Sequence, residues 1–181
     1  MVSSKPFFVA AILAMTLACS PVAAVQEIKE TRIISGFLRE NVEACKMIHR
    51  TVQEMLEDAR PFMNPHHQAK YRFGPGDKHG RSVMSTSRSM AARFKFLRGI
   101  LCHAPMPNRE NTFKGIFACI DAIGVAGKRS LRAVKDGNFA LYMASAQSIE
   151  KEVFGLDKLV KDLEDMVNSS IQATDSKMED L

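Results

Sequence analysis

Apolar residues in the C-terminal half of the chain recur every three or four positions, and this period restricts the fold more than any other feature. In residues 111–135 they are Phe113, Ile116, Phe117, Ile120, Ile123, Gly127, Leu131 and Val134. In residues 138–171 they are Tyr142, Ala146, Ile149, Val153, Leu156, Val160, Leu163 and Val167. Because an α-helix turns every ~3.6 residues, this spacing places the apolar side chains on one stripe of each helix. The sequence predicts a helical hairpin that turns at Asp136-Gly137-Asn138 and needs further helices to cover its apolar stripes.

Two more amphipathic helices are predicted before this hairpin, over residues 26–58 and residues 81–103. The first is expected to end at Pro61, and the second at Pro105 and Pro107. Asn108 or Asn111 is then expected to cap the third helix. The apolar stripe of the first helix is Ile34, Leu38, Val42, Cys45, Ile48, Val52, Met55 and Ala59, and that of the second is Met84, Ser87, Met90, Ala91, Phe94, Leu97 and Leu101. We therefore predict an all-α fold, an up-down-up-down four-helix bundle in which the small Ser87 and Ala91 allow close helix packing.

A long Pro/Gly loop is predicted between helices 1 and 2, over residues 61–79. It contains five residues that interrupt helices, namely Pro61, Pro65, Gly74, Pro75 and Gly76. At about twenty residues it is longer than most connections in compact domains, which makes it a candidate functional loop. A short helical turn is expected within it near residues 67–71.

The N-terminal segment has the pattern of a secretory signal peptide. Lys5 provides a positive charge, residues 7–18 are apolar except Thr16, and Val22-Ala23-Ala24 offers small residues for cleavage. The apolar run is shorter than the ~20 residues that span a bilayer. We predict a signal peptide over residues 1–24, a bundle domain over residues 25–172, and a flexible acidic tail over residues 173–181. The protein is then exported, and secreted or periplasmic.

A lipoprotein interpretation remains open at Cys19. The sequence Leu17-Ala18-Cys19 resembles a bacterial lipoprotein processing site, although Thr16 stands where a leucine is usual. A lipid chain on Cys19 anchors the protein to a membrane, whereas cleavage after residue 24 releases it.

Three further cysteines, Cys45, Cys102 and Cys119, follow the leader. Export favours a disulfide. At 1.5 Å per residue, Cys45 lies roughly 21 Å and Cys119 roughly 25 Å from the same end of the bundle, so the candidate disulfide joins Cys45 to Cys119. The alternatives are three buried thiols that pack as small apolar groups, or a Cys102 bridge between two chains.

Several side chains of the types that bind copper(I) or zinc occur in and near the long loop. They are Met63, His66, His67 and His79, together with Cys45 and His49, which lie four residues apart on one predicted helix. None of them has a recognised metal-ligand spacing. We expect no cofactor, and copper or zinc is the alternative.

Basic and acidic residues are segregated along the chain. Residues 66–98 contain eight Lys or Arg and one Asp, and residues 150–181 contain nine Asp or Glu and four Lys. The preferred explanation is that the second and fourth helices are neighbours of opposite charge. The other explanation is a surface for an anionic or protein partner, with nucleic acid not expected because the protein is exported. The candidate partner-binding residues are Lys70, Arg72, Lys78, Arg81, Arg88, Arg93 and Arg98.

No catalytic constellation or phosphate-binding motif is present in the sequence, so we expect a non-enzymatic protein. The function predicted is that of an exported helical-bundle binding protein of unknown partner, with its contact surface at the basic loop and the second helix. The alternative is a periplasmic or secreted protein that binds copper, zinc or a small ligand.

The export prediction is checked by mass spectrometry of the N-terminus of protein from the exported fraction. A free N-terminus near Val25 is expected, because the small residues before it are those that signal peptidase reads. A diacylglycerol-modified Cys19 establishes the lipoprotein alternative instead, and an intact Met1 contradicts both.

Overall fold

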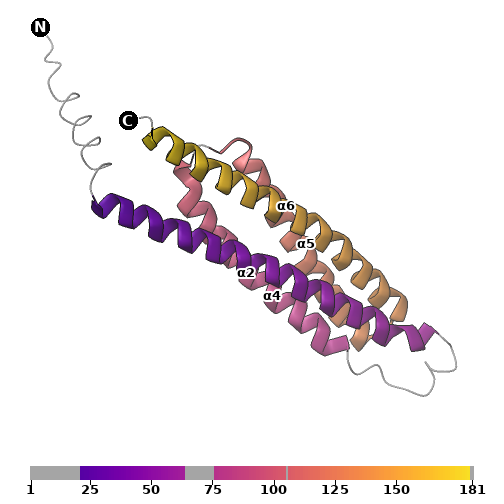
Figure 1. Ribbon diagram of the computed structural model, residues 1–181. Helices are drawn as coiled ribbons and strands as arrows, with labels where there is room; N and C mark the ends of the chain where they lie inside the picture. Colours follow the sequence, from indigo (N-terminus) through magenta and orange to yellow (C-terminus); the bar gives the residue numbers. More distant parts are fainter. Residues whose placement is uncertain (1–20, 64–75, 105, 180–181) are drawn as a thin grey trace, which may run out of the picture. The chain divides into compact units, whose positions relative to one another are not determined.

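The computed structural model describes residues 21–63, 76–104 and 106–179 (Figure 1). It divides into two compact units, Met1–Phe37 and Leu38–Leu181. The described part of the first unit is helical, and the second unit contains all the contacts discussed below. The elements are α2 (Pro21–Ala59), η1 (Arg60–Met63), α4 (Gly76–Ile100), η2 (Leu101–His103), α5 (Arg109–Lys135) and α6 (Phe139–Glu179).

The second unit is an all-α four-helix bundle, as the sequence predicts. Successive helices run in opposite directions, and α5 packs against both α4 and α6 (Figure 1). Polar contacts join α2 to the other helices: Gln53 Nε2 donates to Glu150 Oε1 on α6 at 2.9 Å, and His79 on α4 lies against Asp58. The described residues contain no strand, and none of their helices is long and apolar enough to cross a membrane.

Three predicted helix boundaries are wrong. Helix α2 begins at Pro21 and not at residue 26. Helix α4 begins at Gly76 and not at residue 81, and its first turn carries Asp77, whose negative charge is favourable at a helix N-terminus. Helix α6 continues through Ser169-Ser170 to Glu179. The Ser169 hydroxyl donates to the Asp165 carbonyl at 2.8 Å, so this serine is accommodated within the helix. The flexibility of residues 173–181 stays a prediction, and the helical turn predicted near residues 67–71 lies outside the described residues.

The turn between α5 and α6 has the geometry that the glycine predicts. Gly137 has a φ of +63°, the left-handed conformation that glycine adopts without a Cβ penalty. Its N–H donates to the Val134 carbonyl at 3.3 Å, and the Asn138 N–H donates to the Ala133 carbonyl at 2.8 Å. These two bonds form a Schellman motif, which satisfies carbonyls at the end of α5. The Asn138 side chain then accepts from the Leu141 N–H at 2.9 Å and caps α6.

The apolar stripe predicted on α6 is confirmed, because all eight of its residues are buried. The stripe on α5 is only partly correct: Phe117, Leu131 and Val134 are half-buried. Their expected places in the core are taken by small residues of the same helix, Ala126, Ser130 and Ala133. Because α5 is covered on two sides, by α4 and by α6, its buried arc is wider than one stripe and includes these positions.

Two glycines make a close approach between α4 and α5, at positions that the sequence analysis did not mark. A Cβ on Gly80 would lie 2.8 Å from Leu131 Cγ and 2.9 Å from Ser130 Oγ. A Cβ on Gly127 would lie 3.0 Å from Met84 Cγ and 3.6 Å from the Gly80 carbonyl. The absence of both side chains therefore lets the two helices pack tightly at this end of α4.

Gly80→Ala should lower the free energy of unfolding by about 1–2 kcal/mol, because the overlap with Leu131 and Ser130 outweighs the higher helix propensity of alanine. Gly99→Ala is the matched control on the same helix, since nothing lies within 4 Å of a Cβ there. That variant should be neutral or more stable by up to ~1 kcal/mol. Urea denaturation followed by far-UV circular dichroism measures both, and equal stability of the two variants contradicts the close crossing.

Candidate functional site

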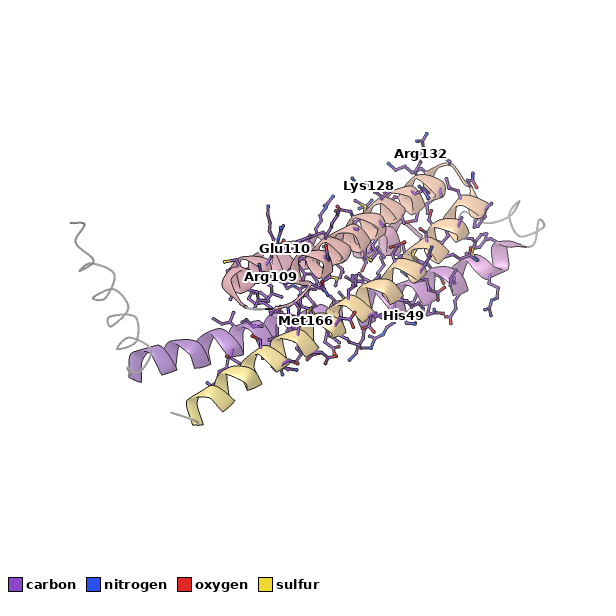
Figure 2. The ribbon with its side chains drawn as sticks, turned by 90° about the horizontal axis from the view of Figure 1, so that it is seen from above. His49, Arg109, Glu110, Lys128, Arg132 and Met166 are labelled. Carbon is purple, nitrogen blue, oxygen red and sulfur yellow. The ribbon has the colours of Figure 1, made fainter. Side chains whose placement is uncertain are left out.

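The four helices differ sharply in charge. Six basic residues and one acid lie on α4, and six basic residues and two acids lie on α5. In contrast, α6 has four basic residues and eight acids, and α2 has five basic residues and seven acids. Lys128 and Arg132 project from α5 on one side of the bundle, whereas His49 lies on the opposite side, beside α6 (Figure 2). The basic charge is therefore concentrated on the α4–α5 pair.

The predicted partner-binding residues on α4 are not all equally available. Arg81 pairs with Asp77 on the same helix, and Arg98 pairs with Glu110 of α5 at 2.6 Å. The hydrogen bond from Arg98 lowers the pKa of the Glu110 carboxyl below its usual value. Arg93 is largely covered and lies 3.7 Å from Glu40 of α2. The two remaining members of the set on this helix are Lys78 and Arg88, and no carboxylate among the described residues pairs with them. Lys70 and Arg72 lie outside the described residues.

The preferred explanation of the charge segregation finds no support in these pairs. In the part of the chain that the structure describes, no ion pair joins α4 to α6. The carboxylates that α4 contacts on other helices belong to α2 and α5. Most of the basic charge on α4 and α5 therefore faces solvent.

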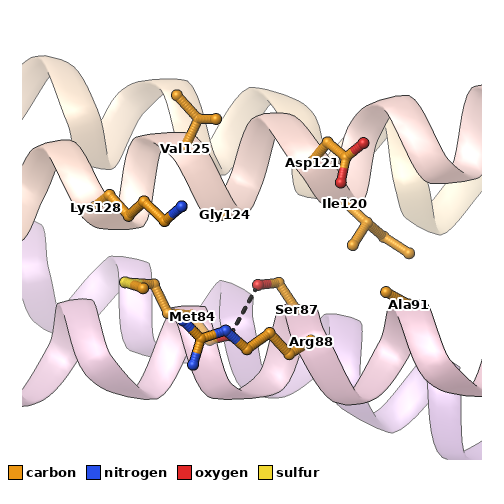
Figure 3. A pocket seen from close by; sticks show the side chains of 9 residues that line it. All are labelled: Met84, Ser87, Arg88, Ala91, Ile120, Asp121, Gly124, Val125 and Lys128. Atoms are coloured by element: carbon orange, nitrogen blue, oxygen red, sulfur yellow. Dashed lines mark hydrogen bonds between the residues drawn. The ribbon is translucent and has the colours of Figure 1, made fainter.

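A groove of about 430 Å³ lies between α4 and α5 within this basic region (Figure 3). Arg88 approaches it from α4 and Lys128 from α5, and Asp121 lies further along the α5 wall. None of these three side chains has an ion-pair partner among the described residues. The other lining residues are apolar or small: Met84, Ser87, Ala91, Ile120, Gly124 and Val125.

Small residues account for the depth of this groove. A Cβ on Gly124 would meet only Ser87 Oγ, at 3.6 Å, and the Ser87 hydroxyl is directed to the Met84 carbonyl at 3.0 Å (Figure 3). Ser87 and Ala91, which the sequence marks for close packing, therefore help to leave a space that no side chain fills. Lys128 and Asp121 are functional candidates that the sequence reasoning missed. Gly124 lies four residues before Lys128 and on the same wall of the groove, but this spacing alone does not show which way α5 faces.

Of the candidate metal ligands, only His79, Cys45 and His49 have described side chains. His79 is buried, its Nε2 lies 3.0 Å from Asp58 Oδ2, and its Nδ1 lies 3.5 Å from Glu54 Oε2. It therefore joins the start of α4 to the end of α2. Only the backbone of Met63 is described, in η1, and His66 and His67 lie outside the described residues. Among the described residues there is no group of three or more His, Cys, Asp or Glu side chains that could hold a metal ion.

Cys45 and His49, the other candidate pair, do share one site. Both line a groove of about 590 Å³ between α2 and α6. The His49 ring meets the edge of Phe154, with ring centroids 5.3 Å apart. Burial, with a smaller effect of Asp157, raises the pKa of the Cys45 thiol to about 12, so the thiol is neutral at physiological pH. Because the thiolate is the form that coordinates, a metal ion bound by Cys45 would have to displace the thiol proton.

All three described cysteines are free thiols, so the candidate Cys45–Cys119 disulfide is not formed in this structure. The two thiols nevertheless belong to one region of the bundle. Besides burial, Asp157 and Cys119 both raise the pKa of Cys45. A Cβ on Gly155, two residues before Asp157, would lie 3.6 Å from Cys119 Sγ. Burial also raises the pKa of Cys119. Cys102 is exposed, in η2.

A comparison of the chain with protein-family models, with curated proteins and with solved structures finds no match.

Thiol labelling with a maleimide, followed by peptide mapping, should modify Cys102 first and Cys45 last. Cys45 is only 2% exposed and its pKa is about 12, so its reactive thiolate is both inaccessible and scarce near neutral pH. In the unfolded protein all three should react at similar rates. Labelling of native Cys45 as fast as Cys102 contradicts the burial described for α2, and a Cys45–Cys119 peptide found without reducing agent establishes the disulfide.

Proposed function

We propose that this protein is an exported, non-enzymatic binding protein that contacts an acidic protein partner through the basic face of α4 and α5. The contact surface is centred on the α4–α5 groove, and it extends over the basic residues of α4 that the sequence marks. The observation that carries the proposal is the pair of cations at this groove, Arg88 and Lys128, which have no ion-pair partner among the described residues.

The chemistry of the groove favours a protein over a simple anion. Met84, Ile120 and the exposed Val125 give it apolar surface beside the two cations. Buried apolar anchors surrounded by charged residues are typical of protein–protein contacts. An acidic partner that inserts one apolar side chain, with carboxylates beside it, complements both properties. The concentrated positive charge then accelerates encounter at low salt.

The proposal is tested by pull-down from the exported fraction with the wild-type protein and the double variant Arg88→Glu, Lys128→Glu. The control is Lys95→Glu, Lys114→Glu, which makes the same change in net charge at exposed positions of α4 and α5 that do not line the groove. For a partner that depends on the groove, the amount captured falls at least tenfold with the first variant and is unchanged with the second. The amount captured also falls as the salt concentration rises.

Two outcomes contradict the proposal. If both variants keep every partner, the basic face is not the contact surface. If both lose partners equally, binding depends on net charge and not on the groove. Circular dichroism of both variants is measured first, and because all four substituted side chains are exposed, no loss of helix is expected.

A further inference from the structure

The groove between α2 and α6 lies among acidic helices, yet its lining is cationic. Its lining contains three basic residues, Lys46 and Arg50 on α2 and Lys161 on α6. Asp157 is the only carboxylate in the lining. Lys161 is held by Asp157 at 2.6 Å, and Lys46 is held at 2.8 Å by Glu43, one turn away. Arg50 is different, because no carboxylate in the described part of the chain pairs with it. An anionic group that enters the groove therefore finds one uncommitted guanidinium.

The two buried residues of the groove lining carry no charge. Cys45 and Val153 are buried beneath it, and the Cys45 thiol is neutral because burial raises its pKa to about 12. Phe154 stands at the wall with 62% of its surface exposed, the largest fraction among the exposed large apolar residues of the described chain. Exposed aromatic surface beside a cavity gains free energy when an apolar ligand covers it.

The length and the volume of the groove suit a small elongated ligand. Its lining positions on α2 run from Val42 to Gln53, which corresponds to roughly 16 Å along the helix axis. Its volume of about 590 Å³ lies within the range of small-molecule sites, roughly 300–1,000 Å³. At one end Gln53 donates to Glu150 at 2.9 Å and ties the two helices together, so the walls are preformed.

We infer that the α2–α6 groove is a binding site for a single-chain amphiphile with a carboxylate head, such as a fatty acid. The acyl chain lies along Val42, Val153 and Phe154, and the carboxylate pairs with Arg50. Arginine suits this role because its planar guanidinium holds a carboxylate by two parallel hydrogen bonds. This site is separate from the α4–α5 contact surface, and neither inference depends on the other.

A partner helix fits the groove less well than an acyl chain. A docked helix needs apolar contacts over several turns, at spacings of three and four residues. On α2 and α6 of the second unit, within the described residues, only Met47 and Phe154 are exposed large apolar side chains. A second copy of the chain seated there is therefore an outcome for the experiment to detect.

The experiment is titration calorimetry of the purified protein with sodium laurate below its micelle concentration. Wild-type protein should bind laurate with one site per chain. Phe154→Ala and Arg50→Gln should each weaken binding about tenfold, and since both side chains are exposed at the surface they should leave helix content unchanged. The matched controls are Phe96→Ala on α4 and Lys158→Gln on α6, which do not line the groove and should bind as the wild type does.

Uncharged dodecanol separates the two parts of the site. Its affinity for the wild-type protein should be about tenfold lower than that of laurate. Its affinity for the Arg50→Gln variant should equal that for the wild type. Absence of laurate binding overturns the inference, as does equal loss in the groove and control variants. Equal affinity for dodecanol and laurate overturns the carboxylate contact. A dimer in sedimentation experiments that Phe154→Ala dissociates, without laurate binding, assigns the groove to a second copy and also overturns it.

Discussion

Burial of the apolar stripes against one another is the interaction on which the rest of this structure depends. Isolated helices are only marginally stable in water, and most helical stability in proteins comes from packing an amphipathic face. Here all eight stripe residues of α6 are buried, and α5 is covered on two sides. The polar contacts between helices, such as that of Gln53 with Glu150, select the rotation of helices that apolar burial already holds together.

The same packing determines where ligands and partners can be received. Small residues have two opposite effects at the α4–α5 contact. Gly80 and Gly127 meet directly and bring the helices close, whereas Gly124 and Ala91 lie at positions where no facing side chain fills the space. The α4–α5 groove therefore lies between helices that approach closely at Gly80 and Gly127, and the α2–α6 groove lies between helices joined by the Gln53–Glu150 hydrogen bond. Walls that are held by such contacts need little rearrangement on binding, which reduces its ordering cost.

The architecture was predictable from the sequence because the hydrophobic period and the punctuating Pro and Gly residues are local signals. The Schellman turn at Gly137 and the buried stripe of α6 follow from them directly. The sites were less predictable, because they depend on how helices are rotated and how closely they approach. The sequence placed Arg88 in a basic segment but could not show that Lys128 of α5 faces the same groove. It likewise assigned His79 to a loop, whereas burial and two carboxylates of α2 make it part of the core.

The contact of His79 with Asp58 and Glu54 has a consequence for the evolution of the connection between α2 and α4. It holds the last turns of one helix against the first turns of the next, so the two ends of the intervening segment meet whatever its length. The entropic cost of closing such a loop grows only logarithmically, by roughly 0.6 kcal/mol for each doubling in length. Insertions between Met63 and Gly76 should therefore cost the bundle little free energy of folding.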